Sequence, residues 1–169
     1  MTRPPRPRPL WIQFLSLAVA IVVVDQATKA WIVAQLAGGG EVRILGDYLR
    51  LIYTENSGAL FGILREQALL FAIVSVAVAV LIVAVHARAG RSPYLTITLG
   101  LLLGGWAGNF IDRVTLGHVV DFVDMGIGTV RFWAYNVADS CITVALLLLV
   151  LMAVHPAVAS WRTGRTEEP

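Results

Sequence analysis

Residues 137–154 read VADSCITVALLLLVLMAV, an apolar run that carries one acid, Asp139, near its start. A helix needs about 17–25 mainly apolar residues to cross a bilayer, and this run has that length. An ionised carboxylate in or beside hydrocarbon costs about 2.5–3.5 kcal/mol even on the most lenient insertion scale. The stretch therefore predicts a membrane-spanning helix whose acid has a function.

Three further apolar runs cover residues 10–36, 68–85 and 94–111. The chain is 57% hydrophobic and only 14% charged, with a mean hydropathy of +0.75. This composition is too apolar for a soluble domain. Because backbone groups in lipid must be satisfied within their own segment, we expect an all-α membrane protein with four transmembrane helices in a single domain of residues 1–169.

The first run has an alternative interpretation as a cleaved signal peptide, because it follows an arginine-rich start and contains Ala-Val-Ala at residues 18–20. The apolar run continues past residue 20, however, and resumes after Lys29. Its length favours a retained first span.

Basic residues flank the four runs on one predicted side of the membrane: Arg3, Arg6, Arg8, Arg88, Arg91, Arg162 and Arg165. The positive-inside rule assigns that side, with both termini, to the cytoplasm. Segments 37–67 and 112–136 then face the outside. The basic residues are scattered around apolar runs, so we expect no nucleic-acid partner.

The two outer segments contain strand-like pairs at 41–45 with 48–54 and at 119–123 with 129–133. They predict a small extracytoplasmic β platform above the helices. Residues 58–67 are apolar with charges at the end, which predicts a short interfacial helix.

A second acid, Asp121, lies in the apolar stretch HVVDFV at 118–123. Two carboxylates that share one proton and hold one water can hydrolyse a bond, and we interpret Asp121 and Asp139 as such a pair. The alternative is two structural acids. Asn136-x-x-Asp139 resembles a helix N-cap with an acid at the third helical position, and His118 is the charged candidate nearest to Asp121.

Asp25 and Lys29 are four residues apart and share one face of the first predicted span. An internal ion pair whose lysine reaches outward to the interface is favoured over a substrate anchor. Asn109, Asp112 and Arg113 end the third run. For Arg113, a stabilising cation at a helix C-terminus and a grip on an anionic or carbonyl group remain equally open.

Gly100, Gly104 and Gly108 recur every four residues, a pattern that lets a second helix approach closely. Asn56 precedes Ser57-Gly58, which indicates a loop turn.

The three histidines, His86, His118 and His155, lack the spacing of metal ligands. The single cysteine, Cys141, lies within an apolar run, as a packed thiol does. No Gly-x-Ser-x-Gly elbow is present in the sequence. We therefore expect neither a metal nor an organic cofactor.

Five ordered blocks of this sequence resemble one family, the bacterial lipoprotein signal peptidases (signal peptidase II). The blocks are DQATK at 25–29, YTENSGALF at 53–61, GGWAGNFIDR at 104–113, GHVVDF at 117–122 and YNVADS at 135–140. Any one block is a weak signal, whereas five in order and spacing are highly specific.

The resemblance implies an aspartic endopeptidase with Asp121 and Asp139 as the catalytic pair. It further implies that four residues line or support the site: Asn56, Asn109, Arg113 and Asn136. Three further polar positions, Asp25, Lys29 and Asp112, have a more structural role in this interpretation. Leu60 and Tyr135 depart conservatively from residues that are frequent in the family.

The resemblance also implies lipid-modified prolipoproteins as substrates, membrane lipid as a partner, and cleavage of the signal peptide just before the diacylglyceryl-modified cysteine. It places the chain, as a monomer, in the bacterial cytoplasmic (inner) membrane with its active site near the outer face. Two rivals are a small proton-coupled transporter that uses the acids as a relay, and a non-catalytic scaffold built on the glycine face.

Overall fold

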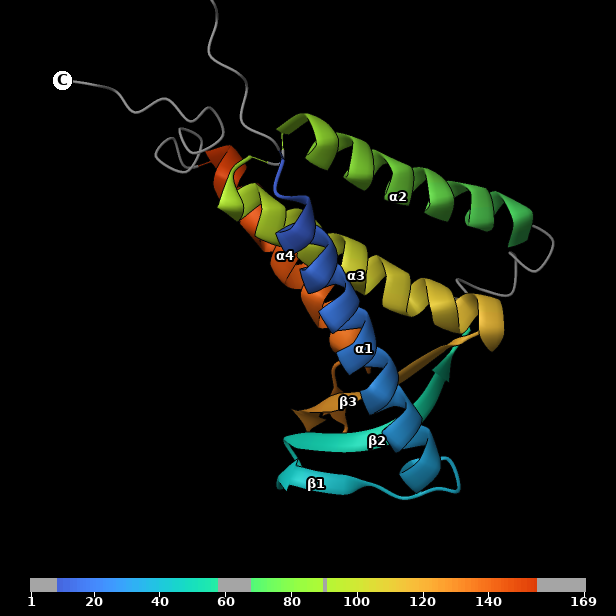
Figure 1. Ribbon diagram of the computed structural model, residues 1–169. Coiled ribbons are helices and arrows are strands. Elements are labelled where there is room, and N and C mark those ends of the chain that lie inside the picture. The colour runs from blue at the N-terminus through green and yellow to red at the C-terminus, as the bar shows by residue number, and fades with distance from the viewer. Residues whose placement is uncertain (1–8, 58–67, 90, 155–169) are drawn as a thin grey trace, which may run out of the picture.

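The computed structural model of the chain describes residues 9–57, 68–89 and 91–154. Within these residues the helices are α1 (Trp11–Leu36), α2 (Ala68–Ala89), α3 (Pro93–Thr115) and α4 (Val137–Val154). The strands are β1 (Val42–Leu45), β2 (Leu49–Asn56), β3 (Val119–Ile127) and β4 (Val130–Arg131). Figure 1 shows the sheet at one end of the helices, opposite the start of α1 and the end of α4.

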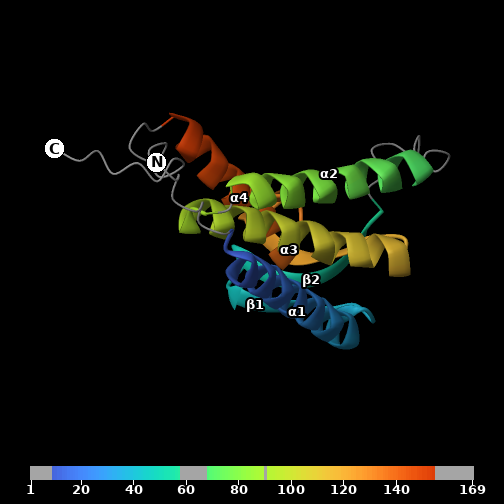
Figure 2. The ribbon, with the colours of Figure 1, turned by 45° about the horizontal axis from the view of Figure 1, so that its top comes forward.

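Three of the described helices, α1, α3 and α4, are long and apolar enough to cross a membrane. They agree with the predicted spans at 10–36, 94–111 and 137–154, and α3 extends four residues further, to Thr115. The run at 68–85 also forms a helix, α2. Its residues 74–89 form an apolar helical segment that is shorter than the three spanning candidates. Figure 2 shows α2 against α3, on the side away from α1.

The predicted glycine stripe lies where α3 packs against α1. A Cβ on Gly100 would lie 3.0 Å from a methyl carbon of Leu17, and one on Gly104 would lie 2.8 Å from the Cβ of Ile21. Gly105, beside the stripe, faces the neighbouring helix α4, where an added Cβ would meet the carbonyl oxygen of Ala138. The absence of side chains thus lets α3 lie close to both helices, as the spacing predicts.

All four strands belong to one antiparallel sheet of order β1-β2-β3-β4. The two hairpins predicted from the sequence are present, although β3 is longer and β4 shorter than expected. The pairing of β2 with β3 joins the two hairpins into one sheet. In this pairing Thr54 is opposite Asp121 and Asn56 is opposite Val119.

Two clusters of buried apolar side chains hold the helices and the sheet together. One, toward the start of α1, contains Phe14, Ile82, Leu95, Leu99 and Met152. The other contains Ile32 and Leu36 of α1 together with Val120 and Phe122 of β3, and it fixes the sheet against the end of α1.

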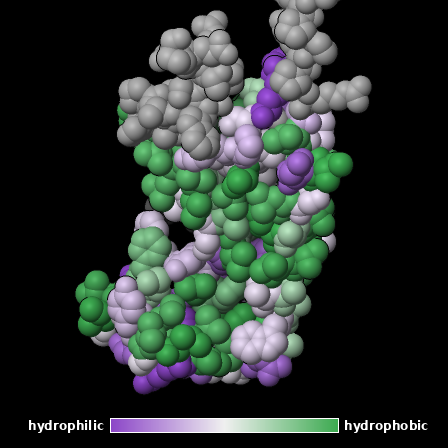
Figure 3. All heavy atoms as spheres, turned by 60° about the vertical axis from the view of Figure 1, so that its left-hand side comes forward, coloured by the Kyte–Doolittle hydropathy of each residue, from purple (hydrophilic) through white to green (hydrophobic). Residues whose placement is uncertain are grey.

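Apolar side chains cover the middle of the molecule on the face drawn in Figure 3, and hydrophilic residues gather at the sheet end. Exposed apolar residues also lie on the sheet, where they include Ile127 and Val130, and just after it at Trp133. The predicted interfacial helix at 58–67 lies outside the described residues.

Candidate active site

Asp121 lies in β3, where its side chain accepts two amide hydrogen bonds. Asn56 Nδ2 donates to Asp121 Oδ2 at 2.8 Å, and Asn136 Nδ2 donates to Asp121 Oδ1 at 2.7 Å. Only 2% of the residue is exposed. Both donors stabilise negative charge on the carboxylate, whereas burial opposes it.

Asp139 lies in the first turn of α4 and forms a capping box with Asn136. The backbone N–H of Asp139 donates to Asn136 Oδ1 at 2.9 Å, and the backbone N–H of Asn136 donates to Asp139 Oδ2 at 3.2 Å. The N-cap predicted from Asn136-x-x-Asp139 is therefore present. Asp139 Oδ1 remains turned toward Asn109, whose Nδ2 donates to it at 2.7 Å.

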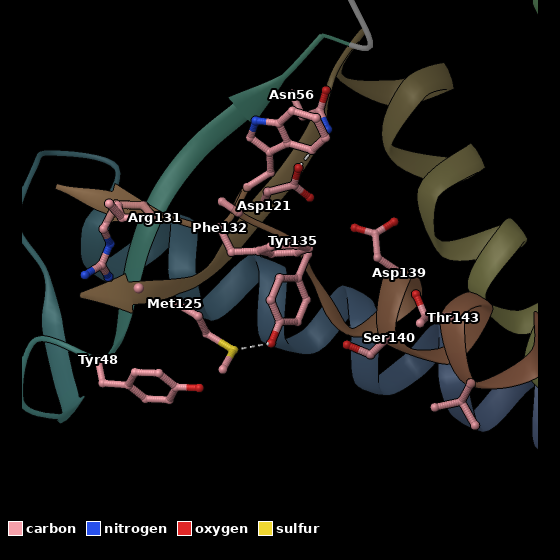
Figure 4. Close-up of a pocket in the computed structure, with 15 residues that line it drawn as sticks. Tyr48, Asn56, Asp121, Met125, Arg131, Phe132, Tyr135, Asp139, Ser140 and Thr143 are labelled. Carbon is pink, nitrogen blue, oxygen red and sulfur yellow. Dashed lines mark hydrogen bonds between the residues drawn. The ribbon is translucent and has the colours of Figure 1, made fainter. Parts of the chain in front are cut away.

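Asn136 connects the two acids through its side chain. The side-chain oxygen Oδ1 caps the helix that carries Asp139, and the side-chain nitrogen Nδ2 donates to Asp121. It is fully buried. Figure 4 shows the carboxyl groups of Asp121 and Asp139 facing the same space from opposite sides, one from the strand and the other from the helix.

The environment of Asp121 favours its protonated form. Burial raises the pKa of this carboxyl above its ordinary value, and the neighbouring Asp139 adds to the shift. The hydrogen bonds from Asn56 and Asn136 and the charge of Lys29 act in the opposite direction. Asp121 is therefore protonated more readily than a free aspartic acid.

A cavity of about 970 Å³ opens beside the acids. Asn56, Asp121, Asp139 and Ser140 lie at its polar end. Its remaining wall is mainly apolar and includes Tyr48, Met125, Phe132, Trp133 and Val144. A mainly apolar cavity of this size with a few polar groups at one end is typical of ligand-binding sites.

Lys29 is buried beneath the acids. Its ammonium group contacts Asp25 Oδ2 at 2.7 Å and Asp112 Oδ2 at 2.9 Å, and it donates to Asn109 Oδ1 at 3.1 Å. The ion pair with Asp25 that the four-residue spacing indicates is present. The prediction that Lys29 reaches outward is wrong, because only 3% of the residue is exposed and two carboxylates hold its charge inside the bundle.

The turn predicted at Asn56 is also wrong, because this residue ends β2 and pairs with Val119. His118, the charged candidate nearest to Asp121 in the sequence, lies with its Nδ1 3.9 Å from Glu55 Oε2. Arg113 is exposed at the end of α3, where its guanidinium donates to the carbonyl of Asn109 at 3.3 Å. This contact corresponds to the first of the two roles considered for Arg113, at the helix C-terminus.

Sequence reasoning missed two parts of the site. Met125 lines the cavity together with Asp121, and the alternation of a β-strand would have placed positions 121, 123 and 125 on one face. Asp124 accepts hydrogen bonds from Arg50 Nε at 2.9 Å and from Arg131 Nη2 at 2.7 Å, which joins β2, β3 and the cavity-lining Arg131. No local signal in the sequence indicates this cross-strand cluster.

Comparison with known proteins places the chain in a family. The model of the signal peptidase (SPase) II family matches residues 17–155. A lipoprotein signal peptidase of Symbiobacterium thermophilum is 40% identical over 82% of this chain and 91% of its own length. That of Geobacillus kaustophilus is 41% identical over 79% of this chain and 87% of its own length.

Solved structures agree with this assignment. A bacterial membrane enzyme determined by the in meso method at 1.9 Å resolution has a TM-score of 0.81 and 29% sequence identity to this chain. The similarity covers 90% of this chain and 99% of that enzyme. A second such structure, at 2.3 Å, has a TM-score of 0.76 and 28% identity, and covers 98% of this chain. The chain therefore belongs to the signal peptidase II family of bacterial membrane peptidases.

Proposed function

We propose that the chain is an aspartic endopeptidase that removes the signal peptide of diacylglyceryl-modified prolipoproteins by cutting just before the lipidated cysteine. The observation that supports this most is the joint placement of Asp121 and Asp139. They are 18 positions apart in the sequence, yet both bond to Asn136 and both line one cavity.

We propose that Asp121 carries the proton of the resting pair and that Asp139 carries the negative charge. Burial favours the neutral form of Asp121, whose pKa is raised. Asp139 lies at the N-terminus of α4, where the helix dipole and a backbone N–H stabilise an anion. This asymmetry supports Asp139 as the general base and Asp121 as the general acid.

The reaction then proceeds in two steps. Asp139 takes a proton from a water molecule while the oxygen of that water attacks the scissile carbonyl carbon. Asp121 gives its proton to the carbonyl oxygen. When the tetrahedral intermediate collapses, the C–N bond breaks and the leaving amine takes the proton from Asp139, while Asp121 recovers its own from the hydroxyl group. General acid–base assistance of this kind contributes about 10²–10⁴-fold to a rate.

The shape of the cavity suits this substrate class. Asn56 and the acids form its polar end, and the wall toward Phe132, Trp133 and Val144 is apolar. Those three residues are themselves exposed. Phe132 and Trp133 directly follow β4, and Val144 lies in α4. A peptide carrying two acyl chains can place its reacting carbonyl at the acids and its lipid along this wall, which is continuous with the apolar face of α4.

We further propose that the chain is a monomer in the bacterial cytoplasmic membrane, with four spans, α2 included. Both termini lie in the cytoplasm, and the sheet and active site lie near the outer face. The start of α1 and the end of α4 both lie at the end of the helices remote from the sheet, which supports this orientation (Figure 1). The arginines in the segments assigned to the cytoplasm support it as well. Exposed Ile127, Val130 and Trp133 suit contact with membrane lipid at that face.

The transporter alternative requires acids distributed through the depth of the membrane. Asp121 and Asp139 instead meet at the sheet end of the helices, and Asp25 and Asp112 lie next to them through Lys29 and Asn109. This clustering favours hydrolysis at one surface.

The test is cleavage of a diacylglyceryl-modified prolipoprotein by the purified chain in detergent. Wild type is expected to cut before the modified cysteine, and Asp121→Asn and Asp139→Asn are expected to lose cleavage while they keep the wild-type unfolding temperature within a few degrees. Glu55→Gln, an exposed acid at the end of β2, is the matched control and should retain activity. Cleavage by either Asn variant would refute the catalytic pair, and failure of wild type to cleave would refute the proposed function.

A further inference from the structure

The chain segments that carry the two acids are each tied down at the residue before the acid. The backbone N–H of Val120, which precedes Asp121, donates to Asp112 Oδ2 at 3.1 Å. The backbone N–H of Ala138, which precedes Asp139, donates to Asp25 Oδ1 at 2.9 Å. Both donors and both acceptors are buried.

The two acceptors are parts of one charged cluster. Lys29 Nζ lies 2.7 Å from Asp25 Oδ2 and 2.9 Å from Asp112 Oδ2. Gln26 Nε2 adds a hydrogen bond to Asp112 Oδ1 at 2.8 Å. The cluster thus connects α1 and α3 through Lys29, and then reaches α4 through Ala138 and β3 through Val120.

We propose that Asp25, Lys29 and Asp112 act as a positioning clamp that sets the separation of the two catalytic carboxyl groups. This inference rests on the proposed function, because it assigns the cluster a role in the reaction of Asp121 and Asp139. None of the three residues touches the reacting atoms in this assignment. They hold the backbone from which the reacting side chains extend.

A role in stability alone accounts poorly for this cluster. Burying three ions costs several kcal/mol for each, and well-packed apolar side chains would stabilise the helices equally well or better. Apolar side chains, however, cannot accept hydrogen bonds from the backbone N–H groups of Val120 and Ala138. The Ala138 N–H lies in the first turn of α4, where no carbonyl of its own helix is available as an acceptor.

The packing of α3 is adapted to the clamp. A Cβ on Gly108 would lie 2.5 Å from Asp25 Oδ2 and 3.3 Å from the Cβ of Ala138. A side chain at this position would therefore displace the carboxylate that holds α4. Gly108 permits α1, α3 and α4 to meet at the point where the clamp holds the helix that carries Asp139.

The clamp also contacts the acids through one amide. Asn109 accepts from Lys29 Nζ with its Oδ1 and donates to Asp139 Oδ1 with its Nδ2. Asn136 Nδ2 also lies 3.1 Å from Asn109 Oδ1. The ammonium group therefore fixes the orientation of the amide that contacts one catalytic acid directly.

Substitutions of Asp112 can separate the effect of its hydrogen bond to the backbone from the effect of its charge. Asp112 Oδ2 accepts from both Lys29 and Val120, whereas Oδ1 accepts only from the neutral amide of Gln26 among the described contacts. Asp112→Asn can keep an oxygen in the Oδ2 position and so retain the anchor. It loses only the hydrogen bond from Gln26 Nε2, which still donates to the carbonyl oxygen of Gly108 at 3.2 Å. Asp112→Ala removes the anchor.

The experiment compares these variants of the full-length chain in detergent, with a diacylglyceryl-modified prolipoprotein as substrate, well below the lowest unfolding temperature. We expect Asp112→Ala to lower kcat about 10²-fold with KM within threefold of wild type, because a displacement of about 1 Å costs that much in rate. Asp112→Asn should keep kcat within about tenfold. Thr98→Val is the matched control, since Thr98 is a buried polar residue of α3 that bonds its own helix, and it should keep wild-type kcat.

Amide hydrogen exchange supplies a readout that does not depend on activity. The peptide containing Val120 should exchange faster in Asp112→Ala, and the peptide containing Ala138 should do so in Asp25→Ala, with Asp112→Asn close to wild type. If Asp112→Ala does not fold, Asp112→Glu replaces it. Glutamate keeps the charge but moves the acceptor by one methylene, and it should also lower kcat at unchanged KM.

Three results would overturn the clamp: wild-type kcat in Asp112→Ala, equal losses of kcat in the Ala and Asn variants, or unchanged exchange at Val120. Failure of wild type to cleave the substrate would refute the proposed peptidase function instead. In that case the exchange measurement would still test whether the cluster holds these two segments.

Discussion

Asn136 and Asp139 bond each other reciprocally at the start of α4, through two hydrogen bonds between side chain and backbone of 2.9 and 3.2 Å. The same Asn136 side chain donates to Asp121 at 2.7 Å. One asparagine therefore caps the helix of the first acid and contacts the second. The two functions of this residue can be separated by substitution.

We expect Asn136→Ser to retain the helix cap and to lose most activity. Serine is as good an N-cap as asparagine, so the free energy of unfolding should change by less than about 1 kcal/mol from this cause. Serine cannot reach Asp121 with an amide donor, so the acids lose their common contact. Cleavage rate and thermal unfolding measured on the same preparation check this. Asn136→Ala is expected to lose both the activity and the stability contributed by the helix cap. Equal activity of the Ser variant and wild type would contradict the bridging role.

Activity should have a bell-shaped dependence on pH, because one proton on the pair is required and either zero or two abolish the reaction. Burial raises the pKa of Asp121, so its proton is retained to a higher pH than in a free aspartic acid. The hydrogen bond from Asn56 favours the ionised carboxylate and therefore lowers this pKa.

Removal of that bond in Asn56→Ala should accordingly move the alkaline limb of the profile to higher pH. The measurement is the pH dependence of kcat/KM for wild type, Asn56→Ala and the control Glu55→Gln. An alkaline limb that moves to lower pH, or that moves equally in the control, would be inconsistent with the assignment of the shared proton to Asp121.

The sheet should lose stability in acid through Asp124. Hydrogen bonds from Arg131, and also from Arg50, hold the pKa of this carboxyl below its ordinary value. A carboxyl with a lowered pKa in the folded state contributes stability above its unfolded pKa of about 3.9, and this contribution is lost as pH falls through the folded value. Wild type should therefore unfold at a lower temperature below about pH 4.

Asp124→Asn should lower the free energy of unfolding at pH 7 by roughly 1–3 kcal/mol and reduce this dependence on acid. The control is Glu55→Gln, whose side chain is 56% exposed and which contacts neither Arg50 nor Arg131 among the described residues, and it should change stability by less than about 1 kcal/mol. Thermal unfolding at several pH values measures both. An acid dependence in Asp124→Asn equal to that of wild type would show that other groups cause it.

The close contact of α1 and α3 should be sensitive to single methyl groups. An added Cβ in Gly104→Ala would lie 2.8 Å from the Cβ of Ile21 and 2.9 Å from the carbonyl oxygen of Ala18. Such overpacking costs about 1–3 kcal/mol. Gly38→Ala is the control, because nothing lies within 4 Å of its added Cβ. Unfolding temperatures that are equal in the two variants would contradict this packing.

Local pattern in the sequence predicted most of the helical architecture. The apolar runs predict α1 and α4 nearly to the residue and α3 except for its last turn. The small-residue spacing of Gly100 and Gly104 predicts the close approach of a neighbouring helix. The N-cap at Asn136 was equally visible, since it depends on two residues that are three positions apart. The ordered motifs also predicted the family, which the comparisons confirmed.

Contacts between distant parts of the chain were not predictable in this way. Asn56 looked like a turn residue because nothing near it in sequence shows that β2 pairs with β3. The sequence predicts an ion pair from which Lys29 reaches outward, because a long side chain can extend to the interface. Only the approach of α3 brings Asp112 to it.

Hydropathy and motif spacing are local properties, so the sequence alone identifies the segments that are apolar enough to span a membrane, the positions of the acids and the family. The folded chain adds that Asp121 and Asp139 share Asn136, that Asn56 reaches Asp121, and that a buried lysine links the anchors of both acids. These contacts depend on strand pairing and helix packing between segments up to 113 residues apart, which local propensity does not encode.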